Sequence, residues 1–464
     1  MESAERMNKP LHIVILAAGE GTRMKSSLPK VLQPIGGRPM LTHLLDAAAA
    51  LKPAGIQAVV GAGAEQVKAA CGSYDVDWVL QEQRRGTGHA LMQAMPRIPE
   101  DADVLVLLGD HPLIPVQVLA ELAGDRSAPL SVLTMELENP LGYGRVLRDV
   151  AGRVCGVVEE RDATPEQRAV REVNTGIVMA EGAALRRWLD RLDCDNAKGE
   201  YYLTDIFAMA RAEGVAIRGL LAPDPRDLQG ANDRRQLAAL ESRFRERAAG
   251  ALMDAGVLIA DPRRIDIRGS VSAGADVRLD VNVVLEGGIR LGDGVSVGPG
   301  CVLRDCELAD GTRVHAYSVL EGVRTTGACD IGPFARLRPG TELSRGCKVG
   351  NFVEAKNARL GEGSKASHLT YLGDSDIGRN VNIGAGTITC NYDGANKHRT
   401  TIEDDVFIGS NTALVAPVTV HRGATVGAGS TVSKDAPEDA LTVSRARQAT
   451  IRGWKRPRKD GEER

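Results

Sequence analysis

The second half of the chain places an aliphatic residue at every sixth position. A period of six matches neither the 3.6-residue turn of an α-helix nor the two-residue alternation of a β-strand. It matches a parallel β-helix with three flat faces, in which each face takes one hexapeptide and each inward side chain stacks on its counterpart one coil away. The longest unbroken run comprises Ile402, Ile408, Leu414, Val420, Val426 and Val432.

The composition agrees with this repeat. Glycine accounts for 52 of the 464 residues, whereas Phe, Trp and Tyr together make up 3%. A narrow prism has room inside for aliphatic side chains and little room for aromatic ones. Its corners favour Gly or Asn, because a positive φ costs these residues least. The repeat breaks between Thr389 and Thr400, where a polar, turn-forming stretch predicts a loop that leaves the prism.

The first half alternates strand-like and helical stretches, which is typical of an α/β domain with a mainly parallel sheet. An amphipathic helix is the expected connector between the halves, with Asn232 or Asp233 as its N-cap. We therefore predict an α/β domain over residues 1–234, a linker helix over 235–256 and the β-helix over 257–464. The strands expected in the first half are Ile13–Leu16, Ala58–Val60, Val104–Leu108, Ser131–Leu137, Val154–Val158 and Gly176–Met179.

Charge and hydropathy narrow the classes of function. The 58 Lys and Arg residues nearly balance the 61 Asp and Glu residues, so the chain has no general electrostatic footprint for nucleic acid. No segment approaches the ~20 apolar residues of a membrane span. Acidic Glu2 and Glu5 precede the short apolar run Ile13–Ala18, which argues against a signal peptide.

The cysteines and a basic stretch bear on the location of the protein and on its partners. The eight cysteines form no CxxC pair, which favours free thiols in a reducing compartment, so we expect a cytoplasmic protein. The basic stretch Lys455–Lys459 is expected to be a solvated, disordered tail, with a polyanion contact as the alternative.

A glycine-rich turn, Ala17 to Arg23, follows the first expected strand and suits phosphate binding by backbone N–H groups. It lacks the third glycine of a dinucleotide fingerprint and the GK[ST] of a Walker loop. Arg23 and Lys30 add two cations that suit phosphates. Asp110 follows the strand Val104–Leu108 at the sheet edge where ligands bind. Its carboxylate suits Mg²⁺ shared with substrate phosphates, with a helix cap as the alternative.

Several first-half motifs together carry a family resemblance. They are LAAGEGTRMKSSLPKVL from Leu16, Gln81 with Gly86-Thr87-Gly88-His89-Ala90, the stretch Asn139 to Arg145, Val158-Glu159, Asn174-Thr175-Gly176 and the stretch Gly199 to Asp205. They resemble the sugar nucleotidyltransferases. Residues 11–454 as a whole are similar to the bifunctional family of N-acetylglucosamine-1-phosphate uridyltransferases and glucosamine-1-phosphate N-acetyltransferases. The resemblance implies a Rossmann-like α/β nucleotidyltransferase domain with a mainly parallel sheet, followed by an all-β left-handed parallel β-helix of hexapeptide repeats.

The resemblance implies that the first half transfers UMP from UTP to N-acetylglucosamine-1-phosphate. Pyrophosphate leaves as the sugar phosphate attacks, so positioning and charge neutralisation suffice without an enzyme nucleophile. Arg23 and Lys30 match catalytic phosphate-handling cations, and Asp110 and Asn232 match Mg²⁺ ligands. Leu108 and His111 depart from the family's pattern on the uracil side. The residues that match UTP and UDP-N-acetylglucosamine contacts are Leu16, Ala17, Ala18, Gly19, Lys30, Gln81, Gly86, Thr87, Leu108, Gly109, Asp110, Gly144, Glu159, Asn174 and Asn232.

Polar groups also gather on neighbouring coils of the expected β-helix. Arg338 and Lys356 are separated by three hexapeptides, which make one full coil, so they should lie one above the other. Two stacked cations indicate a bound anion, and a sugar phosphate is the natural candidate. His368 lies two faces further on, with a side chain suited to general-base catalysis near neutral pH.

The stretch from Ile331 to Tyr392 is similar to the acetyltransferase domain of the same bifunctional family. The resemblance implies that His368 takes a proton from the amine of glucosamine-1-phosphate as that amine attacks acetyl-CoA. It also implies a homotrimer. The matching sugar-phosphate contacts are Arg338, Lys356, Tyr371 and Asn382, with Glu354 as a neighbour that orients the amine. The matching acetyl-CoA contacts are Ala385, Asn391, Tyr392, Ser410, Ala428 and Arg445.

Three functions follow as hypotheses. The leading one is the bifunctional enzyme. The second is a monofunctional sugar-1-phosphate nucleotidyltransferase whose β-helix only assembles subunits, and the polar constellation around His368 argues against it. The third is a non-catalytic regulatory subunit, and the intact cations and carboxylate of the first half argue against it.

Overall fold

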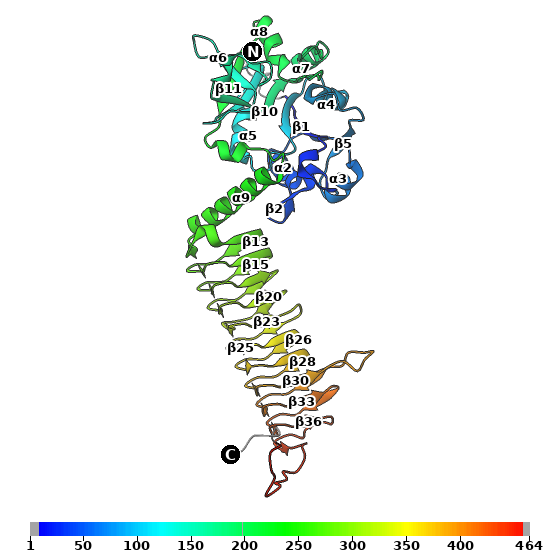
Figure 1. Cartoon of the computed structure of the whole chain (residues 1–464), viewed down its shortest axis with the longest axis vertical. Helices are drawn as coiled ribbons and strands as arrows, with labels where there is room; N and C mark the ends of the chain where they lie inside the picture. The colour runs from blue at the N-terminus through cyan, green and yellow to red at the C-terminus, as the bar shows by residue number, and fades with distance from the viewer. Residues whose placement is uncertain (1–8, 197, 458–464) are drawn as a thin grey trace. The chain divides into compact units, whose positions relative to one another are not determined.

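The computed structural model describes residues 9–196 and 198–457 and divides into two compact units, the first ending at Arg247 and the second beginning at Ala248 (Figure 1). The boundary falls inside helix α9 (Arg234–Asp254), where the sequence predicts the linker helix. Asp233 is the N-cap of this helix, because its Oδ1 accepts hydrogen bonds from the N–H groups of Arg235 and Gln236 at 2.9 Å. Glu2, Glu5, Arg458 and Lys459 lie outside the described residues.

The first unit is built on a sheet with the strand order β11-β7-β10-β6-β1-β4-β5. The predicted mainly parallel sheet is confirmed, with β10 as the exception, because β10 runs antiparallel to both β6 and β7. A hairpin of β8 (Arg145–Arg148) and β9 (Val154–Val158) pairs with β10. The sheet has nine strands with this hairpin, and the other seven are β1 (Leu11–Ala17), β4 (Gly55–Val60), β5 (Asp77–Leu80), β6 (Asp103–Leu108), β7 (Leu130–Glu136), β10 (Glu172–Glu181) and β11 (Ile217–Leu221).

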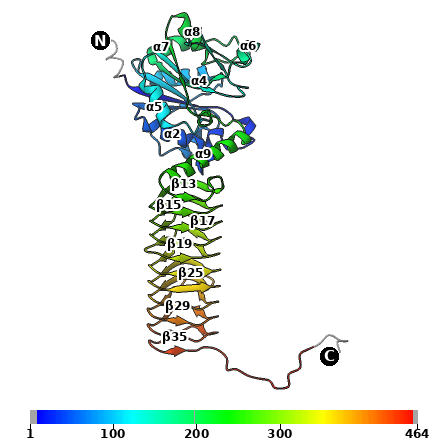
Figure 2. The same cartoon turned by 90° about the vertical axis from the view of Figure 1, so that its left-hand side faces the viewer.

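Helices cover both faces of this sheet (Figures 1 and 2). Alternate residues of β1 point to opposite faces, so Ile13 and Ile15 enter one core and Val14 enters the other. The first core also takes residues from α2, α3 and α5, and the second takes residues from α4, α7 and α8. The helices are α2 (Met40–Ala50), α3 (Ala64–Ala70), α4 (Thr87–Ala94), α5 (Val116–Gly124), α6 (Pro165–Arg168), α7 (Gly182–Leu189) and α8 (Asp205–Ala212).

The second unit is a parallel β-helix in which the strands of each coil pair with those of the next (Figure 2). Its described residues form two sheets. One face of the prism carries β12 (Leu258–Ile259), β14 (Arg278–Leu279), β16 (Ser296–Val297), β19 (Arg313–Val314), β22 (Asp330–Ile331), β25 (Lys348–Asn351), β27 (Lys365–His368), β29 (Asn382–Ile383), β32 (Phe407–Ile408), β35 (Thr425–Val426) and β37 (Leu441–Thr442).

The larger sheet covers the other two faces, because its long strands bend around a corner at a residue such as Asn357, whose φ is 48°. Its strands are β13 (Asp266–Ala273), β15 (Val284–Leu291), β17 (Val302–Arg304), β18 (Glu307–Leu308), β20 (Val319–Glu321), β21 (Arg324–Thr325), β23 (Arg336–Leu337), β24 (Glu342–Leu343), β26 (Glu354–Leu360), β28 (Tyr371–Ile377), β30 (Ile388–Cys390), β31 (Thr400–Ile402), β33 (Ala413–Val415), β34 (Val418–Val420) and β36 (Thr431–Val432).

The interior of the prism confirms the hexapeptide period. The aliphatic run that contains Leu303 and the run that contains Val283 and Ile289 are offset by two residues, and both are buried in one continuous core. Small hydroxyl side chains take the second of these positions in many coils. They are Thr312, Ser318, Thr341, Ser364, Thr370, Ser375, Thr387, Thr400, Thr412 and Ser430.

Coil length varies along the prism. The register pairs Asp330 with Lys348, a coil of three complete hexapeptides, and then pairs Lys348 with Lys365, a coil that is shorter by a single residue. The coil from Asn382 to Phe407 is much longer, because the loop predicted from the break in the repeat is inserted there. This loop lies between the ends of β30 and β31 and projects from the prism in Figure 1.

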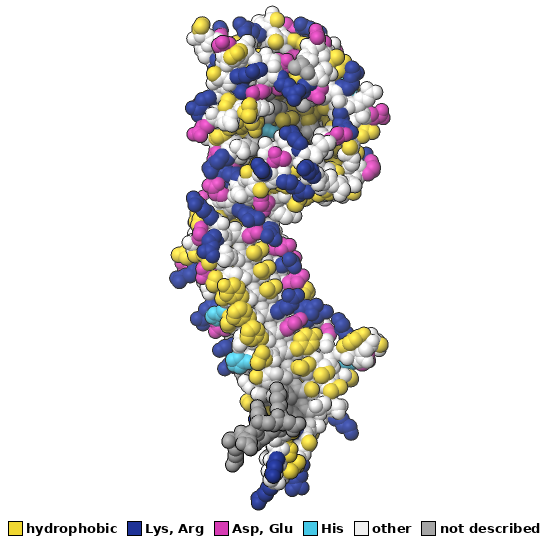
Figure 3. Space-filling view, in the orientation of Figure 1, with side chains coloured by type: hydrophobic (Ala, Val, Ile, Leu, Met, Phe, Trp, Pro, Cys, Tyr) yellow, Lys and Arg dark blue, Asp and Glu magenta, His cyan; other side chains and the backbone are white. Residues whose placement is uncertain are grey.

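One corner of the prism departs from the sequence expectation. Four large side chains turn this corner with φ between 49° and 57°, where Gly or Asn was expected. Each of these side chains is 47–62% exposed. The three aromatic rings stack in sequence with centroids 5.5 and 5.4 Å apart, and Figure 3 shows exposed hydrophobic side chains gathered along the prism. We call this set the corner ladder; it consists of Tyr317, Phe334, Phe352 and Leu369.

The cysteines of the described chain all have free thiols. Burial inside the prism raises the pKa of Cys306 and of Cys347 to about 11 and that of Cys329 to about 12, so these thiols stay protonated near neutral pH. None of the helices in the described part of the chain has the length and apolar character needed to span a membrane.

Candidate active sites

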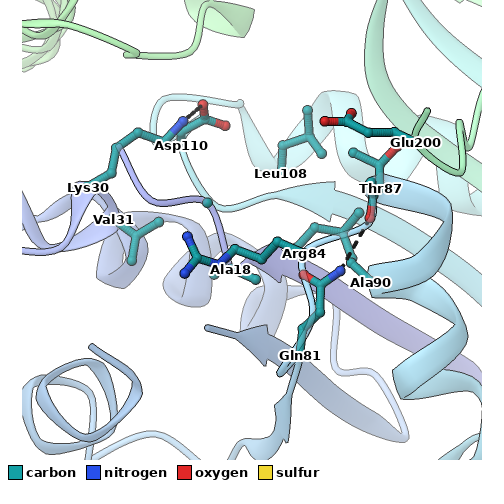
Figure 4. Close-up of a pocket in the computed structure, with 14 residues that line it drawn as sticks. Ala18, Lys30, Val31, Gln81, Arg84, Thr87, Ala90, Leu108, Asp110 and Glu200 are labelled. Carbon is teal, nitrogen blue, oxygen red and sulfur yellow. Dashed lines mark hydrogen bonds and ion pairs between the residues drawn. The ribbon is translucent and has the colours of Figure 1, made fainter. Parts of the chain in front are cut away.

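A first cavity, of about 310 Å³, opens at the carboxyl ends of β1 and β6 (Figure 4). Ligands of open α/β sheets bind at this edge. The glycine-rich turn after β1, the turn before α4 and the end of β6 form its wall. Its lining residues are Leu16, Ala17, Ala18, Gly19, Lys30, Val31, Gln81, Arg84, Gly86, Thr87, Ala90, Leu108, Asp110 and Glu200.

Two glycines allow the chain to approach itself closely around this cavity. Gly21 has a φ of 63°, and a Cβ there would lie 2.5 Å from the Cβ of Lys30. Gly86 has a φ of 107°, and a Cβ there would lie 2.6 Å from the carbonyl oxygen of Tyr201. Both positions therefore require glycine for its backbone freedom and for its lack of a side chain.

A cation and two oxygen donors meet beside the cavity. Lys30 Nζ lies 2.5 Å from Asp110 Oδ2 and 3.1 Å from Asn232 Oδ1. Burial alone would raise the pKa of Asp110, but neighbouring His111 and the Lys30 ammonium outweigh it and hold that pKa below its ordinary value. Asp110 therefore stays ionised.

The same two oxygens fit a divalent cation. Asp110 and Asn232 already converge on one positive group, and carboxylate and amide oxygens are ligands that Mg²⁺ accepts. Within the described residues, no group of three or more His, Cys, Asp or Glu side chains forms an all-protein metal site. Two protein ligands suit Mg²⁺ when substrate phosphates complete its shell.

A second cavity, of about 200 Å³, adjoins the first, since Thr87 and Leu108 line both. Glu159 Oε1 accepts a hydrogen bond from Thr204 Oγ1 at 3.2 Å, and Asn174 Oδ1 accepts one from the Gly176 N–H at 2.9 Å. Its lining residues are Thr87, Leu108, His111, Gly142, Tyr143, Gly144, Glu159, Asn174, Thr175, Gly176, Val178, Leu203, Thr204 and Phe207.

The two cavities bring together most of the site residues expected in the first half. The exceptions are Arg23, Gly109 and Asn232. Arg23 is exposed on the 3₁₀ turn Thr22–Met24 and does not line either cavity. Gly109 donates its N–H to Leu16 O at 2.9 Å, behind the lining residues. Asn232 reaches the site through its contact with Lys30.

Leu108 and His111, which flank Gly109 and Asp110, both line the second cavity, and Leu108 also lines the first. Leu108 fills space that a side chain at position 176 would otherwise use, because a Cβ on Gly176 would lie 2.6 Å from Leu108 Cδ1. His111 lines the second cavity and not the first. Their departure from the family's pattern therefore bears on the second cavity as well as on the uracil side.

On the prism, His368 stands at the end of β27. Its Nδ1 lies 2.7 Å from Oδ1 of Asn351, the residue that is in register with His368 on the preceding coil. When Asn351 Oδ1 accepts this hydrogen bond, the proton is on Nδ1 and the lone pair of Nε2 is free. The sequence analysis did not identify Asn351. It precedes His368 by the length of one of the shorter coils, and this spacing is the signal that could have revealed it.

The residues expected to contact acetyl-CoA follow His368 along the prism. The register pairs Lys365 with Asn382, Asn382 with Phe407 and Phe407 with Thr425. The positions three residues further on are therefore equivalent in four successive coils, and they are occupied by His368, Ala385, Ser410 and Ala428. Arg445 joins this line, since its Nη1 donates to Ala428 O at 2.6 Å.

A cationic cluster lies on the adjacent face. Arg338 pairs with Glu354 at 3.0 Å, and Glu354 is in register with Tyr371 on the next coil. A side-chain contact with Lys397, together with the charges of Lys397 and Arg338, lowers the pKa of Lys356 below its ordinary value. Lys397 comes from the inserted loop and was missed by sequence reasoning, because its sequence position does not reveal where the loop returns.

The inserted loop is attached to the prism by a polar contact. Asn391 Nδ2 donates to Asp374 Oδ2 at 2.5 Å, and Asn357 Nδ2 donates to Asp374 Oδ1 at 2.6 Å. The side chain of Tyr392 is exposed, and its backbone forms an isolated antiparallel β-bridge with Lys397 across the loop. The loop thus carries two of the expected acetyl-CoA contacts and the unexpected cation.

Sequence comparisons cover both units. Residues 13–170 match the MobA-like NTP transferase domain, and residues 399–434 match the six bacterial transferase hexapeptide repeats. The bifunctional protein GlmU of Alkalilimnicola ehrlichii is 57% identical over 451 residues, which is 97% of each chain. The bifunctional protein GlmU of Stenotrophomonas maltophilia is 57% identical over 454 residues, 98% of this chain and 100% of that one. The chain belongs to the GlmU family.

Membership of the GlmU family fits the two-part architecture. The bifunctional protein GlmU of Methylococcus capsulatus is also 56% identical over 96% of this chain. The GlmU relatives span both units, so the chain is a bifunctional enzyme, a nucleotidyltransferase followed by a hexapeptide acyltransferase. This excludes the monofunctional nucleotidyltransferase and the regulatory subunit among the three hypotheses.

Proposed function

We propose that the chain makes UDP-N-acetylglucosamine in two steps. The prism transfers the acetyl group of acetyl-CoA to glucosamine-1-phosphate, and the α/β unit then transfers UMP from UTP to N-acetylglucosamine-1-phosphate. The observation that carries this proposal is the adjoining pair of cavities, one walled by a glycine-rich turn that suits a nucleotide and the other by hydroxyl, amide and carboxylate groups that suit a sugar.

The uridylyl transfer needs positioning and charge neutralisation. A phosphate oxygen of N-acetylglucosamine-1-phosphate forms a bond to the α-phosphorus of UTP, the bond to the bridging oxygen breaks, and pyrophosphate leaves. Lys30 and Arg23 supply positive charge, and the backbone of Leu16–Gly19 with Gln81 and Gly86 orients the nucleotide. Bound Mg²⁺ would be held by Asp110 and Asn232 and would neutralise phosphate charge.

The sugar is held by the second cavity in this proposal. Glu159, Asn174 and the backbone at Gly144 offer acceptors and donors to the hydroxyl and acetamido groups of N-acetylglucosamine. Thr87 and Leu108 line both cavities, so the sugar phosphate and the nucleotide meet there. Gly109 stabilises this junction through its backbone bond to Leu16.

The acetyl transfer uses a general base. The amine of glucosamine-1-phosphate attacks the thioester carbonyl, Nε2 of His368 takes the proton from nitrogen, and coenzyme A leaves as the thiolate. The hydrogen bond from Nδ1 to Asn351 leaves Nε2 free for this proton. Glu354 pairs with Arg338 and is in register with Tyr371, which supports the assignment that it orients the amine.

The substrates of the acetyl transfer match the charges and the line of residues on the prism. Arg338, Lys356 and Lys397 repel one another, so a sugar phosphate between them relieves the repulsion; Tyr371 and Asn382 complete its contacts. Acetyl-CoA lies along the coils above His368, against Ala385, Asn391, Tyr392, Ser410, Ala428 and Arg445.

A homotrimer is part of the proposal, and the corner ladder supports it. Each ladder side chain is 47–62% exposed in a single chain, although its residue type favours burial. A second copy of this chain that covers the ladder would bury it. Phe352→Asp is therefore expected to yield monomers in multi-angle light scattering, and a trimer with this variant would contradict the assignment. Free thiols and soluble substrates favour the cytoplasm as the location.

Two parallel assays test the function. His368→Ala should abolish acetyl transfer to glucosamine-1-phosphate and leave UMP transfer near normal, whereas Asp110→Ala should do the reverse. Each variant serves as the folding control for the other activity. A purified protein that acetylates no glucosamine-1-phosphate, or a His368→Ala enzyme with full acetyl transfer, would refute the corresponding half of the proposal.

A further inference from the structure

An ion pair joins two turns at the first cavity. Arg84, in the turn before α4, pairs through Nη1 with Oε1 of Glu20, in the glycine-rich turn after β1. Arg84 lines the cavity, and in Figure 4 its side chain reaches from the Gln81 side towards the glycine-rich turn. Neither residue belongs to the site expected from the sequence.

Both cations of the cavity have carboxylate partners, and Glu200 adds a further carboxylate to its lining. Lys30 and Arg84 are the two cationic side chains among its described lining residues. The ammonium of Lys30 is paired with Asp110, and the guanidinium of Arg84 is paired with Glu20. A polyphosphate that enters this cavity therefore meets cations that already have carboxylate partners.

The two pairs differ in how readily they open. The side chains of Lys30 and Asp110 are 12% and 14% exposed, whereas those of Arg84 and Glu20 are 36% and 53% exposed. Exposed ion pairs contribute little to stability because water screens them. Arg84 can therefore exchange Glu20 for a stronger partner through side-chain rotation alone, whereas the more buried pair of Lys30 and Asp110 opens less readily.

We propose that Glu20 and Arg84 form a charge latch that the polyphosphate of the nucleotide opens. The phosphates replace Glu20 as the partner of Arg84, so Arg84 is a binding residue for the β- and γ-phosphates and for the pyrophosphate product. Glu20 competes with the phosphates for the same guanidinium, and its carboxylate sets the affinity below what Arg84 alone would give. This inference rests on the nucleotide function proposed above.

Guanidinium groups suit this exchange. A planar guanidinium donates two parallel hydrogen bonds to a carboxylate or to a phosphate, and phosphate carries the larger charge. A neutral molecule therefore leaves the latch closed, whereas a polyphosphate opens it. A nucleoside monophosphate, which lacks the β- and γ-phosphates, should leave the latch closed.

Binding to the full-length protein tests the latch, with UTP, UMP and inorganic pyrophosphate as the probes in titration calorimetry with Mg²⁺. Arg84→Gln should weaken UTP and pyrophosphate binding about tenfold, as expected for the loss of one charge-assisted contact, and should leave UMP binding unchanged. Glu20→Gln should tighten UTP and pyrophosphate binding, and it should lose most of this effect in the Glu20→Gln/Arg84→Gln double variant.

Arg85→Gln is the matched control. Arg85 carries the same charge at the next position, but its guanidinium lies 5.1 Å from the ring centroid of Tyr201 and it does not line the cavity. Arg85→Gln should bind all three probes like the wild type. An equal loss in Arg85→Gln would show a general charge effect and would overturn the latch.

The remaining outcomes separate the latch from the proposed function. If wild type binds UTP and Arg84→Gln binds UTP and pyrophosphate equally well, the latch is wrong and the nucleotide function stands. If Arg84→Gln weakens UMP as much as UTP, Arg84 contacts the α-phosphate or the nucleoside, and the assignment to the polyphosphate is wrong. If wild type binds pyrophosphate through Arg84 but does not bind UTP, the latch stands and the proposed function is wrong.

Discussion

The contact between Asn351 and His368 gives a prediction with a defined size. Asn351→Ala removes the acceptor that lies 2.7 Å from Nδ1 and leaves both tautomers of the imidazole available. A partly exposed hydrogen bond has a net value of about 0.5–1.5 kcal/mol. Since about 1.4 kcal/mol corresponds to a factor of ten, kcat for acetyl transfer should fall roughly twofold to tenfold. Loss of His368 itself should reduce the rate by roughly 10²–10⁴.

The assay follows coenzyme A release from acetyl-CoA with glucosamine-1-phosphate as the acceptor, and UMP transfer is measured in parallel on the same samples. Asn351→Asp is the matched variant, because it keeps the acceptor and adds a negative charge. The added charge stabilises the protonated imidazole, so the acid limb of the pH–rate profile should move to higher pH while the maximal rate is retained.

Three results would refute this reasoning. If kcat is unchanged in Asn351→Ala, the hydrogen bond does not position the base. If kcat falls as far as in His368→Ala, Asn351 has a direct role with the substrate. If the pH profile of Asn351→Asp matches that of the wild type, the new carboxylate does not face the imidazole, and the contact between the two side chains does not persist during turnover.

Three further predictions concern other parts of the chain. Gly21→Ala should reduce UMP transfer and spare acetyl transfer, because its Cβ would lie 2.5 Å from the Cβ of Lys30 at a φ that costs alanine about 1–2 kcal/mol. Ile408→Ala should lower the free energy of unfolding of the prism by about 2–5 kcal/mol, measured by denaturant titration, and Ile408→Val should cost about 0.5–1.5 kcal/mol, since this side chain is fully buried. Burial, followed by the charges of nearby carboxylates, raises the pKa of Asp205 to about 6. As the pH rises, Asp205 ionises first in the unfolded chain, so the stability of the folded chain falls towards pH 6 and stays lower above it. Asp205→Asn should therefore raise Tm more at pH 8 than at pH 5. An equal gain in Tm at both pH values would contradict the last of these.

The periodic parts of the fold were predictable because local sequence dictates them. An inward aliphatic residue at every sixth position fixes the face length of the prism, and alternation in the first half fixes the buried strands. The stacking of Arg338 and Lys356 followed directly, because their coil consists of three complete hexapeptides. The pairing of Asn351 with His368 did not follow, because that coil is shorter by a single residue and a rule of three hexapeptides points to the wrong neighbour.

The missed charged residues share another physical cause. Arg84 and Lys397 reach their sites from turns and loops, and their long side chains can point in many directions until the tertiary structure fixes them. Arg23, which the motif places among the phosphate cations, is exposed and lines neither cavity in the structure, and its role stays a prediction. Backbone geometry, by contrast, explains why Gly21 and Gly86 must be glycine.

The corner ladder connects the conformational cost of four prism residues with the proposed acetyl transfer at His368. The left-handed conformation costs a residue other than glycine roughly 1–2 kcal/mol, so four such residues cost about 4–8 kcal/mol, whereas two stacked ring pairs return only about 1–3 kcal/mol. A single exposed chain therefore keeps these residues at a net loss, which a covering copy of the chain reverses by burying apolar surface. Phe352 and Leu369 directly follow Asn351 and His368 in the sequence. A copy seated on the ladder would lie beside His368, the proposed general base, and exclude water from it, so assembly and acetyl transfer should depend on the same corner, while the α/β unit has its own cores and its own cavities.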